Sequence, residues 1–100
     1  MEKRDAKKVT VNIDFRALSD TGIYDVLEGL RGSDQFDLLF QARRELVRRL
    51  KGQGFNDKKI AKLLTANVYG ILRRREIATE WAPVMDITKQ EFLRLIGIER

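Results

Sequence analysis

Apolar and polar residues alternate strictly along residues 9–15, VTVNIDF. This alternation predicts a β-strand with one buried face. The chain has no second run of the same kind, so the strand has no obvious partner within the monomer. Because unpaired backbone groups are costly, we expect it to pair with the same strand of a second copy, which would make the protein a homodimer.

Apolar residues then repeat at helical spacing in two segments. In residues 18–32 we expect Ser19 to cap a helix and Leu18 to pack on Ile23, and Gly32 to end it. Residues 34–51 form the second predicted helix, which stops at GQG, residues 52–54. Its predicted apolar stripe consists of Phe36, Leu39, Phe40, Leu46, Val47 and Leu50, with Arg43 at the middle of the stripe.

Residues 54–76, GFNDKKIAKLLTANVYGILRRRE, fit two interpretations. Asn56 is placed to cap a helix. Apolar residues continue at three- and four-residue steps as far as Leu72, as one unbroken helix requires. Thr65 is a plausible cap, however, and favours a bend near residues 65–67. We prefer the broken helix and keep the continuous one as the alternative.

The remaining signals complete a mainly α fold. Pro83 should close the helix that contains Trp81, whose ring we expect in the core. TKQE, residues 88–91, is a capping box that begins a short last helix. The predicted architecture is a single domain, 1–100, of about four helices and one N-terminal strand. It divides into a basic arm (1–8), a strand-helix-helix segment (9–51) and C-terminal helices (55–100).

Composition excludes several kinds of chemistry. The 100 residues include no histidine and no cysteine, which removes the usual zinc ligands, the thiol nucleophile and the commonest general base. The acidic residues are scattered as on a solvated surface, so we expect no enzyme, no metal site and no cofactor. No apolar run is long enough to span a bilayer, and the charged start MEKRDAKK lacks a signal-peptide core. We therefore expect a cytoplasmic protein.

Charge is unevenly distributed along the chain. Residues 43–75 contain eleven Lys and Arg against two acidic residues, a local excess of nine positive charges. Residues 14–40 contain two basic and six acidic residues, a local excess of four negative charges. A polyanion bound to the basic zone would relieve its self-repulsion, so nucleic acid is the expected partner. The alternative is that these side chains only keep helix faces solvated.

Residues 9–51 resemble a ribbon-helix-helix protein in their order of strand, short helix, glycine-containing turn and longer amphipathic helix. The resemblance implies that the strand enters the major groove of DNA, where Thr10, Asn12 and Arg16 would contact it. Asp14 would also face the groove, where its negative charge opposes this role. The alternative is that the strand pairs elsewhere and its polar residues are merely exposed.

Residues 54–76 resemble a helix-turn-helix motif through IAKLL and VYGILRR, with a turn about three residues shorter than usual. The resemblance implies a DNA interface with two parts. Lys58, Lys59 and Lys62 would touch phosphate, and Asn67, Tyr69, Gly70, Arg73 and Arg74 would lie nearest the groove. Three consecutive arginines cannot share one helix face, so their guanidinium groups spread round the helix end. This arrangement suits a phosphate groove, and Arg75 therefore belongs to the same candidate site. Alternatively, the arginines stabilise a helix carboxyl end or pair with Glu76 and Glu80.

The sequence thus predicts a DNA-binding homodimer that acts by occupying its site, as a transcriptional regulator or an accessory factor of a plasmid or other mobile element. The alternatives are a protein-binding adaptor, such as an antitoxin or small inhibitor that holds its partner through residues 55–100, and an RNA-binding protein.

Overall fold

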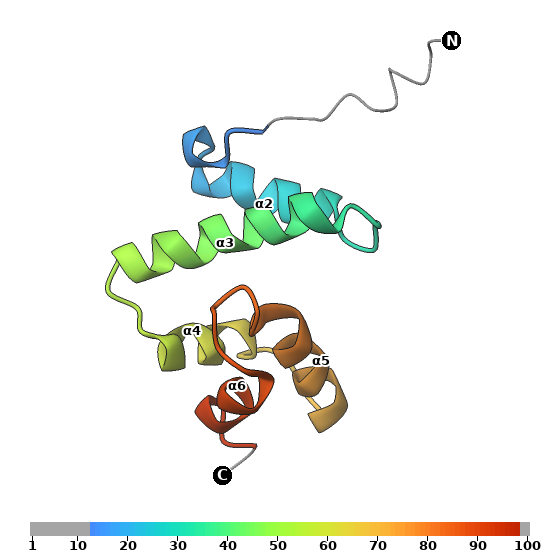
Figure 1. Ribbon diagram of the computed structural model, residues 1–100, viewed down its shortest axis with the longest axis vertical. Helices are drawn as coiled ribbons and strands as arrows, with labels where there is room; N and C mark the ends of the chain where they lie inside the picture. Colours follow the sequence, from blue (N-terminus) through green and yellow to red (C-terminus); the bar gives the residue numbers. More distant parts are fainter. Residues whose placement is uncertain (1–12, 99–100) are drawn as a thin grey trace.

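The computed structural model describes residues 13–98, which form five α-helices and one short 3-10 helix. The elements are η1 (Phe15–Ala17), α2 (Asp20–Gly29), α3 (Phe36–Gly52), α4 (Asp57–Leu64), α5 (Ile71–Trp81) and α6 (Lys89–Leu95). Figure 1 shows two layers: η1, α2 and α3 form the upper layer, and α4, α5 and α6 form the lower layer. The mainly helical fold was predicted, and the fifth helix arises because residues 57–81 form two helices.

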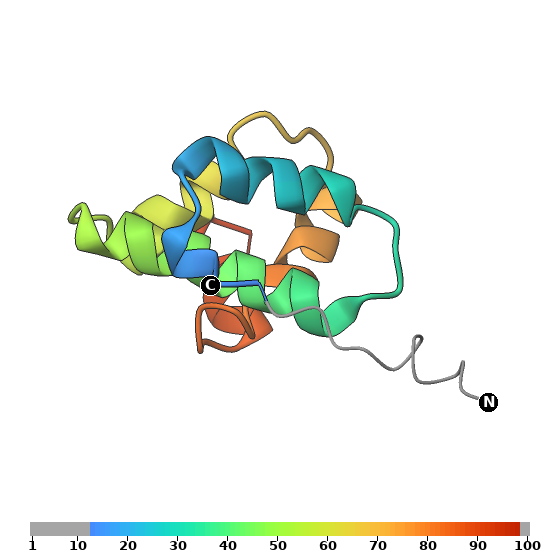
Figure 2. The ribbon, with the colours of Figure 1, turned by 90° about the horizontal axis from the view of Figure 1, so that it is seen from above.

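The upper layer is a helical hairpin in which α2 packs against α3 (Figure 2). Ser19 caps α2 as predicted, since its hydroxyl accepts a hydrogen bond from the Gly22 N–H at 3.0 Å. Ile23, at the centre of α2, is completely buried. Each of these features follows from the local pattern of residues 19–30.

A buried carboxylate ties α3 to the start of the described chain. Glu45 is only 6% exposed and accepts hydrogen bonds from Arg48 at 2.6 and 3.0 Å and from Arg49 at 2.8 Å. Arg49 also donates to the carboxylate of Asp20 at 2.8 Å and to the carbonyl of Phe15 at 3.0 Å. The hydrogen bonds from Arg48, followed by those from Arg49, lower the pKa of Glu45 to about 2 against the cost of burial. This network holds η1 and the start of α2 on α3.

The lower layer is a three-helix unit in which α6 packs against both α4 and α5. Asn56 caps α4, accepting from the Lys59 N–H at 2.9 Å. The predicted capping box of α6 is complete, because Thr88 accepts from the Glu91 N–H at 3.0 Å and donates its own N–H to Glu91 at 2.9 Å. These bonds lower the pKa of Glu91. Ile60, Ala61, Ile77, Ala78, Phe92 and Leu93 are the buried side chains of the three helices.

Two arginines of α3 join the layers. The guanidinium carbon of Arg43 lies 5.2 Å from the centroid of the Trp81 ring. A guanidinium nitrogen of Arg43 also lies 3.8 Å from a carboxylate oxygen of Glu80. Burial lowers the pKa of Arg43, and Glu80 acts in the opposite direction. Arg44 donates to the carbonyl of Val84 at 3.1 Å and to Asp86 at 2.8 Å. The loop between α5 and α6 reaches up towards α3 in Figure 1, and these contacts fix it there.

Two sequence predictions concern the upper layer. Of the predicted strand 9–15, residues 9–12 lie outside the described residues, and with them the proposed strand pairing. Within the described part, Ile13 and Asp14 form no strand and Phe15 begins η1. The predicted apolar stripe of α3 is buried only towards its carboxyl end, and Phe36 and Phe40 near the amino end are exposed. The ion pairs that join the two layers begin after these residues, at Arg43.

No helix within residues 13–98 combines the length and apolar character that crossing a membrane requires.

Candidate nucleic-acid interface

Three lysines follow the cap of α4 and point outward. Lys58, Lys59 and Lys62 are all exposed, and none forms an ion pair within residues 13–98. Lys58 and Lys62 are four residues apart and therefore lie on one side of the helix. Lys59 lies over the ring of Phe55 at 5.5 Å. α4 thus presents three positive charges that no carboxylate of the described chain neutralises.

The end of α4 settles whether residues 57–81 form one helix or two. Thr65 is buried, and its hydroxyl donates to the carbonyl of Ala61 at 2.9 Å. Backbone N–H groups of residues 65, 66 and 68 then donate to carbonyls three residues back, which tightens the chain into a turn. Thr65 therefore closes α4, and the preferred prediction of a break near residues 65–67 is confirmed.

Gly70 determines how the next helix begins. Its φ of +93° lies in the left-handed region, where a side chain would be strained. It precedes Ile71, the first residue of α5. The continuous-helix alternative is wrong for this reason, although the apolar spacing across the turn is regular. Ile71 and Leu72, which a continuous helix would have placed on its apolar stripe, are exposed.

The three consecutive arginines lie near the amino end of α5. A helix amino end carries partial positive charge, so the helix dipole does not favour cations there. The alternative that these arginines stabilise a helix carboxyl end is therefore wrong. Arg73 is exposed and pairs with Glu76 at 3.0 Å, as one alternative predicted. Arg74 donates to the carbonyl of Val68 at 3.1 Å and so holds the turn. Arg75 is partly buried.

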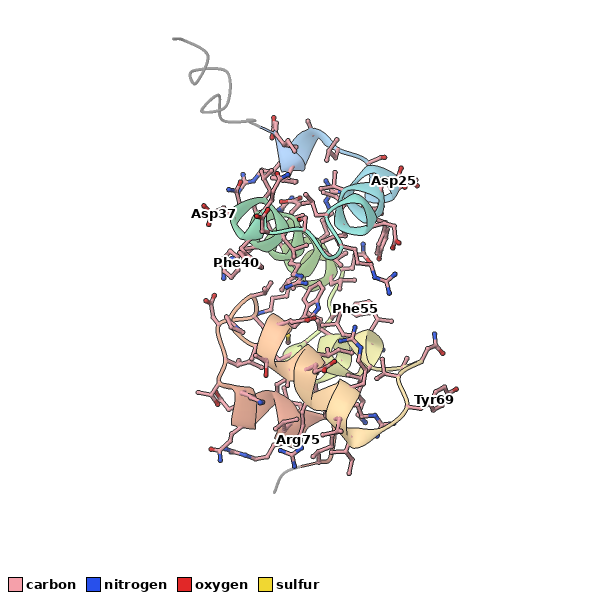
Figure 3. The ribbon with its side chains drawn as sticks, turned by 90° about the vertical axis from the view of Figure 1, so that its right-hand side faces the viewer. Asp25, Asp37, Phe40, Phe55, Tyr69 and Arg75 are labelled. Atoms are coloured by element: carbon pink, nitrogen blue, oxygen red, sulfur yellow. The ribbon has the colours of Figure 1, made fainter. Side chains whose placement is uncertain are left out.

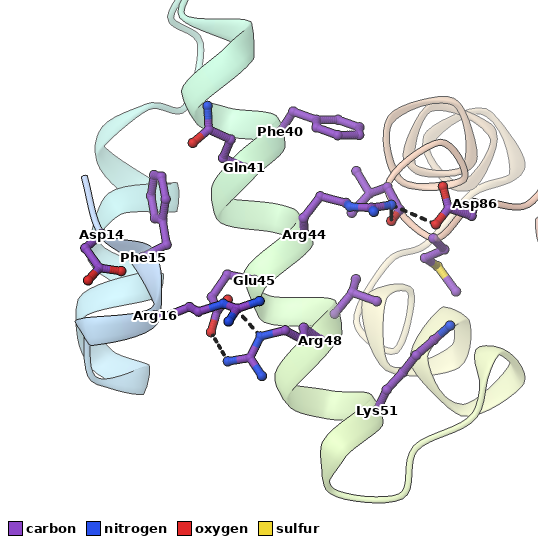
Figure 4. A pocket seen from close by; sticks show the side chains of 13 residues that line it. Asp14, Phe15, Arg16, Phe40, Gln41, Arg44, Glu45, Arg48, Lys51 and Asp86 are labelled. Carbon is purple, nitrogen blue, oxygen red and sulfur yellow. Dashed lines mark hydrogen bonds and ion pairs between the residues drawn. The ribbon is translucent and has the colours of Figure 1, made fainter. Parts of the chain in front are cut away.

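The predicted site residues fall into three groups. The lysines of α4 and the residues Asn67, Tyr69, Arg73, Arg74 and Arg75 come from one continuous helix, turn and helix. Tyr69 is 84% exposed and points away from the molecule in Figure 3. Arg16 lies apart, on η1, beside a cavity of about 620 Å³ that also includes Arg44 and Arg48 (Figure 4). Thr10 and Asn12 lie outside the described residues.

The basic zone of the sequence does not form one basic surface. Six of its eleven cations are matched with carboxylates: Arg43, Arg44, Arg48, Arg49, Lys51 and Arg73. Five of these six come from α3, and their partners include Asp20, Glu80 and Asp86 in other segments of the chain. Every basic residue of α3 thus pairs with a carboxylate, whereas Lys58, Lys59 and Lys62 of α4 pair with none within residues 13–98.

One basic residue near this surface was not predicted. Arg94 of α6 borders a hollow of about 330 Å³ together with Lys58 and Lys62. Arg94 and the two lysines are more than thirty positions apart in the sequence, and the packing of α6 against α4 brings them together. The capping box at residue 88 predicted the helix, but no local signal indicates which helix it meets.

Comparisons with protein-family models, curated protein sequences and solved structures find no significant match. The resemblances to ribbon-helix-helix and helix-turn-helix proteins therefore rest on residue patterns alone.

Proposed function

We propose that this chain binds DNA through α4, the turn at residues 65–70 and the start of α5, and that it acts by occupying its site. The observation that supports this most is the set of three exposed α4 lysines that pair with no carboxylate within residues 13–98. Lysines in this state can neutralise phosphates of DNA, which releases the cations condensed on the DNA and so favours binding.

The start of α5 adds groups that suit a DNA groove. Asn67, Tyr69 and Arg73 are exposed there. The Arg73–Glu76 pair is solvent-exposed on both sides and so contributes little to stability. Arg73 can therefore exchange its carboxylate for a phosphate or a guanine edge at little cost. Arg74 serves the proposed site indirectly by holding the turn against α5.

Occupancy is the proposed mode of action because the chain has neither histidine, the commonest general base, nor cysteine, the thiol nucleophile. A homodimer, as proposed from residues 9–15, would present two such surfaces to two half-sites. The dimer would then act as a transcriptional regulator or as an accessory factor of a mobile element, blocking or recruiting other proteins.

A salt titration tests this proposal. Fluorescence anisotropy with a labelled DNA duplex of mixed sequence would be measured at about 50 and about 200 mM salt. With about six phosphate contacts, we expect the affinity to fall about a thousandfold between them. Equal affinity at both salt concentrations, or no binding at the lower one, would overturn the proposal. Tighter binding of an RNA duplex of the same sequence would assign the surface to RNA.

A protein-binding adaptor is the second candidate, and exposed apolar side chains in the same region favour it. Ile71 and Leu72 are 56% and 80% exposed at the start of α5. Exposed apolar clusters commonly mark protein interfaces. Arg73→Ala and Leu72→Ser separate the two candidates. DNA binding predicts weaker duplex affinity for Arg73→Ala, whereas an adaptor surface predicts that neither change affects it.

A further inference from the structure

The lysines of α4 border an apolar groove. We call it the lysine groove; it has a volume of about 490 Å³ and is lined by Phe55, Asn56, Lys58, Lys59, Lys62 and Leu63. Phe55 and Leu63 supply the apolar surface, and Leu63 is 48% exposed. An apolar groove bordered by three cations that meet no carboxylate of the described residues fits an apolar side chain flanked by carboxylates.

The same chain presents such a surface at the amino end of α3. We call it the acidic aromatic surface; it consists of Asp34, Phe36, Asp37 and Phe40, all of them exposed. Neither Asp34 nor Asp37 forms an ion pair within residues 13–98. Phe36 and Phe40 are four residues apart on the helix, so they lie one turn from each other on the same side of it. Arg44 lies over the ring of Phe40 at 5.8 Å, and Phe36 has no such cation among the described residues. Phe36 is 69% exposed, which is unusual for a large aromatic side chain.

The two surfaces of one copy cannot meet. Figure 3 shows Asp37 and Phe40 on the opposite side of the molecule from Phe55. These two surfaces can therefore meet each other only between copies. We propose that the acidic aromatic surface of one copy docks in the lysine groove of the next, with Phe36 in the groove and Asp34 and Asp37 facing its lysines.

This contact is head-to-tail, because each copy contributes a different surface. Contacts of this kind leave one free surface at each end, so the assembly grows with concentration until it closes into a ring or extends as a chain. It differs from the strand pairing proposed for residues 9–15, which would stop at a dimer. It does not depend on DNA binding, although DNA and a second copy would compete for Lys58 and Lys62.

Analytical ultracentrifugation of the full chain without DNA tests the contact. We expect the average mass to rise with concentration beyond a dimer at low salt and to fall as salt is added. Lys58→Glu with Lys62→Glu should weaken association about tenfold or more, and so should Asp34→Lys with Asp37→Lys, because each places like charges together. Mixing the two variants should restore association, since their surfaces are again complementary. Lys89→Glu, at an exposed lysine outside the groove, is the matched control and should have little effect.

Three results would overturn the proposal: a mass that never exceeds a dimer, association that the charge reversals leave intact, or variants that fail to associate when mixed although circular dichroism shows both to be folded. Should a charge-reversed variant fail to fold, Phe36→Ser replaces it. It removes the side chain that enters the groove while keeping all charges, and undiminished association of this variant would equally refute the contact. Because no DNA is present, these outcomes are independent of the proposed DNA binding.

Discussion

The basic residues of α3 and those of α4 differ in what they contact. In α3, Arg43, Arg44 and Arg49 contact carboxylates or carbonyls of other segments and hold the fold together. In α4, Lys58 and Lys62 contact no carboxylate of the described chain. The comparison shows that a run of positive charge in a sequence does not define a basic surface, because tertiary packing decides which cations are already matched.

The largest expected effect concerns the buried centre of the α3 network. Glu45→Gln removes the charge that Arg48 and Arg49 share. We expect the free energy of unfolding to fall by about 2 kcal/mol, since hydrogen bonds to a charged group are lost in a buried place. Chemical denaturation measures this change. Glu76→Gln, in an exposed pair with Arg73, is the control and should change stability by less than about 0.5 kcal/mol. Equal effects of the two substitutions would mean that Glu45 has no special structural role.

The same carboxylate predicts how stability depends on pH. The pKa of Glu45 is lowered to about 2 in the folded protein, from an ordinary value of 4.5. A lowered pKa means that its contribution is fully present above about pH 4.5 and is lost as pH falls towards 2. Denaturation curves of the parent and of Glu45→Gln should therefore converge as the solution is acidified from pH 5. A constant difference between them over that range would contradict this assignment.

The next largest effect on stability is expected at Gly70, in the turn that precedes α5. Gly70→Ala places a side chain at a φ of +93° and should cost about 1 kcal/mol, although the space around it is open. Gly29→Ala is the matched control, because Gly29 also has open space and lies in α2 without a positive φ. This control should leave stability unchanged or raise it by about 0.5 kcal/mol. Thermal melts of both variants measure the difference, and equal melting temperatures would argue against strain at Gly70.

The smallest expected effect on stability is that of removing two lysine charges from α4. Lys58→Gln with Lys62→Gln should alter the free energy of unfolding by less than about 0.5 kcal/mol, because neither lysine holds another segment. Chemical denaturation checks this result as well. A loss comparable to that of Glu45→Gln would show that the α4 lysines are structural and would remove the contrast between the two helices.

Local signals predicted the helix starts well. Ser19, Asn56 and Thr88 each cap a helix as expected, since capping depends on residues three positions apart. The break between α4 and α5 was located only approximately. Gly70 lies within a regular apolar spacing, and its positive φ is not evident from that spacing.

Contacts between distant segments could not be predicted in the same way. Arg44 and Asp86 are 42 positions apart, and their pairing follows from how the two layers stack. The pairing of Arg43 with Glu80 is of this kind, as is the proximity of Arg94 to the α4 lysines. The sequence therefore indicated an excess of positive charge correctly but could not locate the unmatched part of it.

The salt dependence of DNA binding in two matched variants tests the central claim most directly. One variant carries Lys58→Gln and Lys62→Gln in α4, and the other carries Arg44→Gln and Arg48→Gln in α3. We predict that the slope of log affinity against log salt becomes shallower by about 2 for the α4 variant and stays unchanged for a folded α3 variant. An unchanged slope for the α4 variant, or the larger change in the α3 variant, would contradict the account.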